Sequence, residues 1–459
     1  MLSLIWVLEA IVVGCLLVCR FTNLPAIRPI WARLLLILGA GAAGGMGLTS
    51  CLFFIFGVLL GIPLAAMVLE LLVLVWTGYE AFRRRVPISE SPGGARFPLL
   101  APITVGCVFI ALAIVTGAMW SAWEANPHGN WDAWAIWNLR AKFLTSDTEL
   151  AQRAWSPVLG ATSHSEYPLL VSSFVARCWA FGHSLAAPVP AVISCVFFLA
   201  LVALAAGGVA VLRGPTLGVL MALVLVTSPP ILREVPAQYA DVPLACYFAG
   251  ALVFALLDRP ILAGVSAGLA GWTKDEGLLF LVLFLTAVVV FRRRATLAVI
   301  AGALPAGAII AFFKIWLSKG NASVLPASLT AAANRVADLG RYGAVIAAFG
   351  RELHGMAAGW YHPILPLIVL AVALRFDRER SRDVAFCAAI SATLLVGYLG
   401  VYILTPNDLE WQLQTSLGRL LAQLWPALLL IGFVGLRAPE ADAVVKPMPP
   451  PKGRRKTRR

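Results

Sequence analysis

The sequence predicts an all-α polytopic membrane protein with about thirteen transmembrane helices. The first observation behind this prediction is composition: 60% of the 459 residues are hydrophobic and only 13% are charged, against roughly 45–50% and about 25% in soluble proteins. The second is that the apolar residues gather in runs of roughly 20, the length of a helix that crosses a hydrocarbon core about 30 Å thick. Soluble enzymes, disordered chains, coiled coils and disulfide-rich secreted domains are therefore excluded.

Each apolar run is expected to be a helix, because lipid offers the backbone no other hydrogen-bond partner. The first run has no basic segment before it, so it is typical of a retained span rather than a signal peptide. The expected spans, in chain order, are Leu4–Cys19, Leu34–Phe56, Val58–Tyr79, Leu99–Met119, Ala187–Leu212, Thr216–Ile231, Val242–Leu257, Leu262–Trp272, Leu278–Phe291, Leu297–Trp316, Pro363–Leu374, Val384–Leu404 and Leu417–Leu436.

The net charge of +13 predicts the orientation of these spans. Basic residues cluster at Arg83–Arg85, at Arg292–Arg294 and from Lys452 to the end, and such clusters mark cytoplasmic loops. We therefore expect the C-terminus to be cytoplasmic. The basic tail is expected to contact anionic lipids. No aromatic or folded context accompanies the tail, so nucleic acid is not an expected partner.

This orientation makes two demands on the shorter segments. Residues 167–182 must lie along or dip into the outer face without crossing the membrane. The short runs Leu262–Trp272 and Leu278–Phe291 must form a helical hairpin, whose charged tip, Thr273–Gly277, reaches the outer interface.

The predicted spans and loops divide the chain into three parts. Residues 1–98 hold extra N-terminal spans, residues 99–437 form the membrane core, and residues 438–459 form the basic tail. The core has two long external loops, at 120–166 and 319–359, and a shorter one at Thr405–Ser416. The eight cysteines stand singly, so neither a disulfide framework nor a cysteine zinc site is predicted.

The loop 120–166 holds six of the fifteen tryptophans. An interfacial aromatic belt would explain them, and so would stacking on a sugar or packing on a lipid chain. Within the loop, residues 130–143 are expected to form a helix with Asp132 in its first turn. Asp132 is either a carboxylate stabilised by the helix dipole or a general base or metal ligand. Arg140 and Lys142, two turns later, could snorkel or bind phosphate.

Further charged residues are expected at the same membrane face. Glu166 and Tyr167 stand where the first loop returns to the membrane, and Lys274 and Glu276 stand at the hairpin tip. Two more residues are predicted at the outer ends of spans, Asp241 and Arg419. Asp241 is either a helix cap or a functional carboxylate, and an embedded arginine needs an anionic partner. Carboxylates can activate a hydroxyl group, and cations can bind a lipid phosphate, so the set suits transfer from a phosphate-activated lipid.

Five sequence blocks carry a family resemblance: WDAW, YPLL, YADVP, TKDEG and TSLGRLL. Their order resembles that of the C-type integral-membrane glycosyltransferases, the group of protein O-mannosyltransferases and the lipid A aminoarabinose transferase, and in particular a bacterial envelope branch. The resemblance covers most of residues 99–436. The sequence departs from the mannosyltransferase pattern where Ala133 follows Asp132, because those enzymes have Asp-Glu there. The sugar, the acceptor and any need for a metal therefore stay open.

The resemblance implies an inverting transfer of a sugar from a polyprenyl-phosphate donor to a glycan, lipid or protein acceptor on the extracytoplasmic side. In this reading Asp132 is the general base, and Glu166 positions the acceptor or a cation, with Mg²⁺ or Mn²⁺ as the candidate ions. Tyr167, Lys142 and Glu276 contribute to substrate binding. The residues expected to hold the lipid phosphate or to orient its cations are Arg140, Lys274, Arg419 and Asp241.

Two other functions remain open on the sequence. A transporter or flippase of lipid-linked sugars would also need charged groups at the outer face, together with ionisable residues at the midplane and inverted repeats. An oligosaccharide ligase would use a basic pocket and histidines in a late loop, where His354 and His362 occur.

Overall fold

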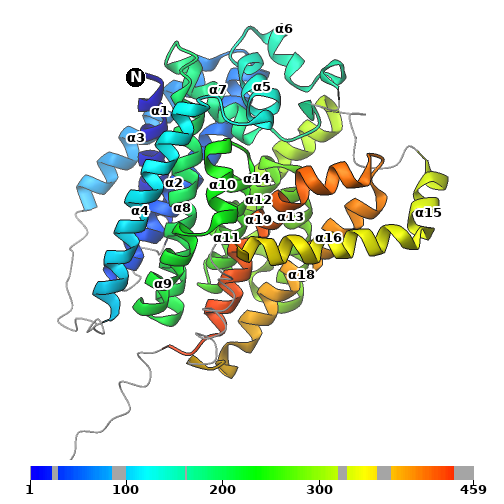
Figure 1. Cartoon of the computed structure of the whole chain (residues 1–459). Coiled ribbons are helices and arrows are strands. Elements are labelled where there is room, and N and C mark those ends of the chain that lie inside the picture. The colour runs from blue at the N-terminus through cyan, green and yellow to red at the C-terminus, as the bar shows by residue number, and fades with distance from the viewer. Residues whose placement is uncertain are drawn as a thin grey trace, which may run out of the picture.

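The protein is a helical bundle in the computed structural model, which describes residues 2–22, 29–84, 100–160, 163–318, 328–358 and 374–438 (Figure 1). Those residues form helices and contain no named strand; the one β-bridge joins Phe376 and Leu436. Eight of the described helices are long and apolar enough to cross a membrane, or nine if one bent pair counts as a single span. The all-α polytopic prediction is confirmed, whereas the count of about thirteen is not.

The long helices largely coincide with the apolar runs. Apolar side chains are stable in lipid or inside the bundle, and a helix satisfies the backbone hydrogen bonds there. The eight are α1 (Leu2–Phe21), α2 (Ile30–Leu52) continued by η2 (Phe53–Leu59), α3 (Pro63–Arg84), α4 (Leu100–Ala125), α8 (Pro188–Arg213), α14 (Thr296–Phe312) continued by η8 (Phe313–Leu317), α18 (Ser381–Leu404) and α19 (Leu409–Gly435). The expected span Pro363–Leu374 lies outside the described residues except for Leu374.

One expected span, Thr216–Ile231, is bent instead of straight. Helix α9 (Pro215–Val226) and helix α10 (Pro229–Ala237) meet at an angle of 55°. Pro229 and Pro230 lack the backbone N–H that would continue the hydrogen-bond ladder of α9, so they start a new helix. The bend places α10 beside α19 and α11 (Asp241–Leu256).

Both of the shorter segments are helical. Helix α7 (Leu170–Phe181) has twelve residues, about 18 Å of helix, which is too short for a hydrocarbon core of about 30 Å. The hairpin expected from the two short runs is formed by α12 (Pro260–Thr273) and α13 (Asp275–Phe291), which turn at Lys274.

Two ion pairs lie at the end of the bundle where α8 ends and α18 begins. There Arg213, at the end of α8, pairs with Asp377 at 2.8 Å, and Arg292, after α13, pairs with Asp383 on α18 at 2.6 Å. The loop after α4 and the hairpin tip lie toward the opposite end.

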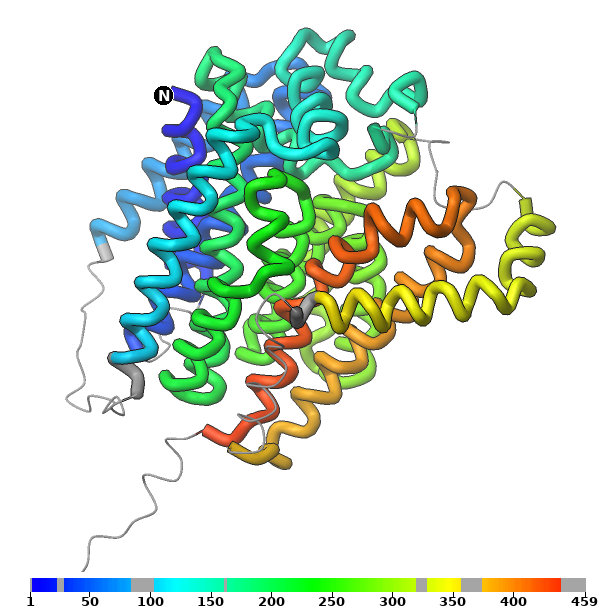
Figure 2. The backbone as a smooth tube through the Cα atoms, in the orientation of Figure 1, coloured from blue at the N-terminus to red at the C-terminus, as the bar shows by residue number. Residues whose placement is uncertain are grey.

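The regions expected as external loops contain more helix than the sequence indicated. In the first loop the chain forms η3 (Ala133–Trp137), α5 (Asn138–Leu144) and the short α6 (Thr148–Ala151). In the second, α15 (Leu329–Ala337) leads into α16 (Leu339–Ala358), which runs across the bundle beside α18 and α19 (Figure 2). Helix α19 begins at Leu409, so most of the expected loop Thr405–Ser416 is helical.

The N-terminal helices pack closely on the core. A Cβ atom on Gly14 of α1 would lie 2.0 Å from the carbonyl oxygen of Gly41 on α2, so only glycine allows this approach. Gly39 lets α2 approach α8 in the same way, because a Cβ there would lie 2.9 Å from the Ala200 carbonyl oxygen. Small residues at helix contacts are the usual means of packing helices in lipid.

Candidate functional site

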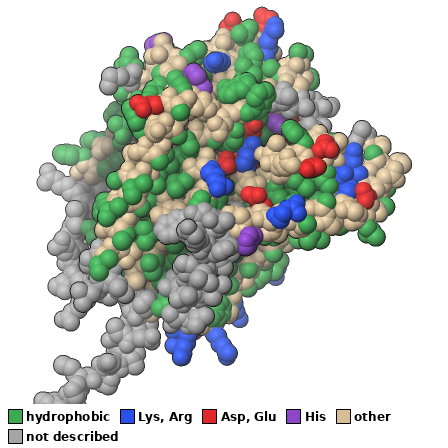
Figure 3. Space-filling view, viewed as in Figure 1, with side chains coloured by type: hydrophobic (Ala, Val, Ile, Leu, Met, Phe, Trp, Pro, Cys, Tyr) green, Lys and Arg blue, Asp and Glu red, His purple; other side chains and the backbone are tan. Residues whose placement is uncertain are grey.

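Arg419 on α19 joins two carboxylates that come from distant parts of the chain. Its Nη1 lies 2.6 Å from Asp132 Oδ2, and its Nη2 lies 2.8 Å from Asp241 Oδ2. Asp241 is 1% exposed, whereas the side chains of Arg419 and Asp132 are 18% and 21% exposed. Figure 3 shows acidic and basic side chains near the middle of the visible face, on a surface that is otherwise largely hydrophobic. The network therefore runs from the buried Asp241 outward to Asp132.

Asp241 is also the partner of Lys274. Lys274 Nζ lies 3.1 Å from Asp241 Oδ1 and 3.0 Å from Glu276 Oε1. Gln423, one turn after Arg419 on α19, donates from Nε2 to Asp241 Oδ1. We call Asp132, Asp241, Lys274, Glu276 and Arg419 the charged cluster. All five were predicted as site residues from the sequence, and the fold brings them together.

Local backbone breaks place these side chains. Gln238 ends α10 in a left-handed conformation, with φ of 59°, which turns the chain so that Asp241 falls in the first turn of α11. Lys274 has an extended backbone between α12 and α13, so its side chain leaves the hairpin tip and reaches Asp241. Tyr239, between these breaks, lies under Arg419, whose Cζ is 4.2 Å from the ring centroid.

Glu166 and Tyr167 lie beside the hairpin tip that carries Lys274 and Asp275. The Glu166 carboxylate lies 2.9 Å from His164 Nδ1, and the Glu166 carbonyl accepts from Lys314 Nζ at 2.7 Å. Lys314 in turn pairs with Asp275 at 2.6 Å. Lys274 Nζ lies 5.8 Å from the centroid of the Tyr167 ring. The return of the first loop to the membrane is thereby fixed beside the hairpin tip.

The structure places Arg140 in the interior of the first loop. Its side chain is 0% exposed, and Nε and Nη2 donate to the carbonyl oxygens of Ala154 and Tyr167, each at 2.8 Å. Longer contacts join it to the carbonyls of His164 and Ser165. Backbone carbonyls thus occupy the donors that a phosphate would need, and in this conformation Arg140 holds the loop together. Lys142 is exposed and lines a separate cavity.

Electrostatic effects keep these groups in defined protonation states. Burial alone would lower the pKa of Lys274, but the carboxylates of Asp241 and Glu276 outweigh it and hold this pKa above its usual value, so the amine stays charged. Burial and the Asp132 carboxylate raise the pKa of Tyr239. Burial and the nearby carboxylates raise the pKa of Tyr167 well above its usual value, so its phenol remains protonated.

Metal binding was left open by the sequence. Among the described residues, no three His, Cys, Asp or Glu side chains come together as ligands for an ion. In the charged cluster, the guanidinium of Arg419 bridges the carboxylates of Asp132 and Asp241. No described residue is therefore assigned to a metal ion.

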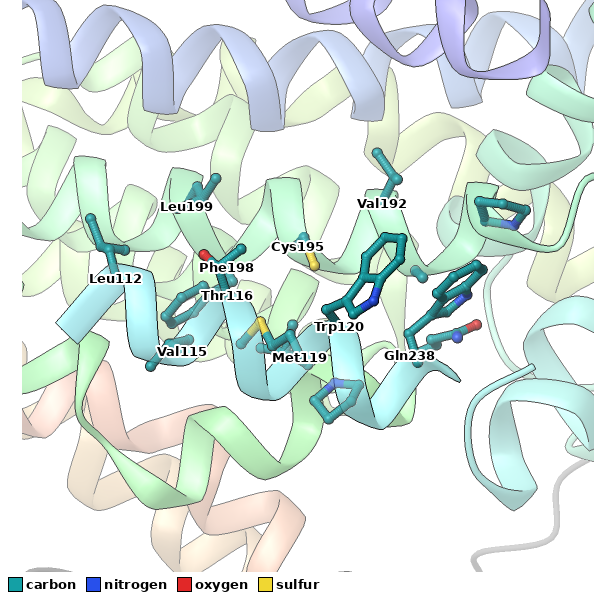
Figure 4. Close-up of a pocket in the computed structure, with 15 residues that line it drawn as sticks. Leu112, Val115, Thr116, Met119, Trp120, Val192, Cys195, Phe198, Leu199 and Gln238 are labelled. Atoms are coloured by element: carbon teal, nitrogen blue, oxygen red, sulfur yellow. The ribbon is translucent and has the colours of Figure 1, made fainter. Parts of the chain in front are cut away.

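An apolar groove lies between α4, α8 and α10, close to the cluster. Its volume is about 320 Å³ (Figure 4). Side chains of α4 and α8 face each other across it, with Trp120, Trp123 and Gln238 toward one end. Gln238 is 4% exposed, and its Oε1 atom has no hydrogen-bond partner among the described residues. Because Gln238 precedes Tyr239, the groove ends next to the residue that lies under Arg419.

Some polar groups of the site were missed in the sequence. Gln423, Lys314 and Glu234 lie within otherwise apolar helices, and Glu234 lies close enough to Asp241 and Arg419 to interact with both electrostatically. A polar side chain inside a span is costly and is a signal of function, and this signal could have identified them.

A second buried cluster was also missed, and it lies among the N-terminal helices. Arg177 on α7 pairs with Glu9 on α1 and Glu70 on α3, with Arg177 Nε 2.9 Å from Glu70 Oε2. The three side chains are almost completely buried, at 0%, 6% and 1% exposed. We call these residues the buried triad. It ties the extra N-terminal helices to the core.

Comparison with known proteins finds no significant match to this chain among family models, curated proteins or solved structures.

Of the two histidines that an oligosaccharide ligase would use, His354 is exposed on α16, and His362 lies outside the described residues.

Proposed function

We propose that the protein is a membrane glycosyltransferase, which moves a sugar from a polyprenyl-phosphate donor to an envelope acceptor on the extracytoplasmic side of a bacterial inner membrane. The observation that carries the proposal is the charged cluster at the end of the bundle opposite to the basic loops, beside an apolar groove. A lipid-linked sugar phosphate needs both features, because one part of it is a hydrocarbon chain and the other an anion.

The cations of the cluster suit a phosphate. A guanidinium can bind a phosphate through two parallel donors. Arg419 donates from Nε and Nη2 to Asp241 Oδ2 and from Nη1 to Asp132 Oδ2, so three of its donors face anions. Asp241 is buried, whereas Asp132 is the more exposed of its two partners. An incoming phosphate would therefore replace Asp132 on Arg419 and leave Asp241 in place. Lys274, held by Asp241 and Glu276, adds a second positive charge.

Release from Arg419 gives Asp132 a role in the reaction. The freed carboxylate takes the proton of the acceptor hydroxyl, whose oxygen attacks the anomeric carbon of the donor sugar. The new glycosidic bond forms as the bond from the anomeric carbon to the phosphate oxygen breaks, with inversion. The bonding electrons leave with the lipid phosphate, whose added charge Arg419 and Lys274 stabilise. Atoms and charge balance without a further reactant.

The apolar groove suits the hydrocarbon chain of the donor. Burial of apolar surface is favourable by about 25 cal/mol per Å² in water, but inside lipid the gain comes from close packing. The end of the groove at Gln238 and Tyr239 would bring the phosphate of a seated chain toward Arg419.

The family resemblance gives independent support. Four of its five sequence blocks supply the charged cluster: WDAW supplies Asp132, YADVP supplies Asp241, TKDEG supplies Lys274 and Glu276, and TSLGRLL supplies Arg419. The fifth block, YPLL, begins with Tyr167, beside Lys274. Blocks that are far apart in the chain thus meet at one place.

Transport of a lipid-linked sugar is the second candidate function, and the buried triad favours it. Ionisable groups inside the membrane are typical of transporters, and Glu9, Glu70 and Arg177 are such groups. The triad shares no residue with the charged cluster, so the two functions make different predictions for it.

The experiment that separates these functions uses the purified full-length protein in liposomes with a panel of polyprenyl-phosphate sugars. The enzyme is supported if free polyprenyl phosphate appears only when an acceptor is added. Movement of intact donor across the bilayer, without release of the lipid phosphate, would instead establish transport and overturn the transferase.

A further inference from the structure

A second cavity, more polar than the groove, lies at the end of the bundle that carries the first external loop. Its volume is about 450 Å³, within the range of small-molecule sites, which is roughly 300–1,000 Å³. Helix α5, the end of α4 and the turn between α7 and α8 enclose it. The lining residues that bear on its chemistry are Asn126, His128, Trp134, Asn138, Lys142 and Trp179. We call it the outer cavity.

Asn138 is the residue that marks the outer cavity as a site. Its side chain is only 7% exposed, and it makes no hydrogen bond with any residue that the structure describes. Its amide atoms are not among the completely buried polar atoms that lack a partner, so they face the open space of the cavity. Asn138 is a cavity-lining residue, so its amide is available to a bound molecule.

Two tryptophans in the wall of the outer cavity favour a ligand with a ring. Trp179 is 4% exposed and donates from Nε1 to the carbonyl of Ala186 at 3.0 Å, so its ring is fixed. Trp134 is 48% exposed and packs edge-on against Trp131, with ring centroids 4.4 Å apart. An exposed indole face carries partial negative charge and attracts the weakly positive C–H groups of a ring.

Together these walls fit a sugar better than a lipid or a free phosphate. An amide both donates and accepts hydrogen bonds, as a hydroxyl group does, and a tryptophan face covers the C–H side of a pyranose ring. Lys142 is the only Lys or Arg among the lining residues, which is too little for a multiply charged phosphate but favours a neutral or acidic sugar over an amino sugar.

The outer cavity also lies on a path toward the charged cluster. Asn138 lines a second, narrow pocket that reaches Gln238 and Tyr239. Tyr239 is the residue under Arg419. The narrow pocket therefore leads from the outer cavity toward the residue that lies under Arg419.

We propose that the outer cavity is a carbohydrate-binding subsite for a hydroxyl-rich, neutral or acidic sugar. That this sugar belongs to the acceptor rests on the proposed transferase function, whereas the binding itself does not. Asn138 hydrogen-bonds the ligand, Trp134 stacks on it, and Lys142 contacts its polar edge.

The test is ligand-observed NMR with the full-length protein in detergent and free glucose, galactose, mannose, arabinose, glucuronic acid and glucosamine as probes. At least one neutral or acidic sugar should bind. Its dissociation constant should rise by at least about tenfold in Asn138→Leu and in Trp134→Ala. Trp411→Ala is the matched control, because Trp411 is 58% exposed on α19 and lies outside the cavity lining; it should leave binding unchanged.

Three outcomes would overturn the proposal: no probe binds, binding is equal in the wild type and in both cavity variants, or inorganic phosphate binds more tightly than every sugar. Trp134→Ala keeps the test informative if Asn138→Leu does not fold, because Trp134 is largely exposed. The assay contains no donor lipid, so sugar binding persists even if the transferase function fails. Asp132→Asn should bind the sugar normally while losing transfer.

Discussion

Arg419 lies 2.6 Å from Asp132, although 287 positions separate the two residues in the chain. The same guanidinium holds Asp241 at 2.8 Å, so one side chain links the first external loop to the start of α11. The two carboxylates differ in burial, since Asp241 is enclosed and the side chain of Asp132 is 21% exposed. A phosphate approaching from the open side meets Asp132 first. This relationship is the basis of the mechanism proposed here for the cluster.

Asp241 is expected to stabilise the fold as well as the site. Asp241→Asn keeps the shape but leaves Arg419 and Lys274 with one carboxylate fewer in a buried place. Removing one partner of a buried ion pair costs about 3–5 kcal/mol. We expect a clearly lower melting temperature of the purified protein in detergent. Glu149→Gln, an acid-to-amide change at an exposed position of the first loop, is the control and should shift it little.

The buried triad is expected to hold the N-terminal helices to the core. Arg177→Leu leaves Glu9 and Glu70 buried without their cation, which should lower the free energy of unfolding by about 3–5 kcal/mol. Thermal unfolding measures it, with the exposed Arg153→Ala as control. Adding Glu9→Gln and Glu70→Gln to Arg177→Leu should recover much of the loss. Equal stability of wild type and Arg177→Leu would show that the triad does not tie these helices.

The triad also separates the two candidate functions. If the protein is a transferase, the triple variant should retain transfer once it is folded, because the triad takes no part in the reaction. If the protein is a transporter that uses these ionisable groups, the same variant should lose lipid movement. The two activities are measured side by side in the liposome assay.

The groove is expected to set the affinity for the donor. Ala191→Phe adds a ring to the groove wall on α8 and should raise the KM for a long-chain donor by about tenfold, which corresponds to about 1.4 kcal/mol. Its kcat should change little, since the charged cluster is untouched. Ala118→Phe, on an exposed position of α4 outside the groove lining, is the control. An unchanged KM in Ala191→Phe would place the donor chain elsewhere.

Much of the fold and of the charged cluster could be predicted because the background is so apolar. Charged residues are rare in this sequence, so those next to apolar runs stand out. This is how Asp132, Asp241, Lys274 and Arg419 were predicted. The bend at Pro229 could also have been read from its two prolines. The start of α19 at Leu409 could have been read as well, because the Asp408 carboxylate caps the helix by accepting from the Trp411 N–H.

The ion pairs and hydrogen bonds within the site could not be predicted from the sequence. Arg140 and Arg419 are both arginines near a membrane surface, yet one binds backbone carbonyls and the other binds two carboxylates. That difference depends on which segments the fold brings together. The role of Asn138 could not be predicted either. Its sequence position does not show that its amide lines a cavity and has no hydrogen-bond partner among the described residues.

The most direct test of the central claim is transfer by Asp132→Asn. The purified wild type and the variant are incubated with a polyprenyl-phosphate sugar and an acceptor, and the released polyprenyl phosphate is measured, with Glu149→Gln as the matched control. We predict release by the wild type and the control, and a fall in kcat of at least about 100-fold in the variant, as expected for loss of a general base. The melting temperature of the variant should show that it is folded. Near-normal release by a folded Asp132→Asn would contradict the assignment of Asp132 as the base.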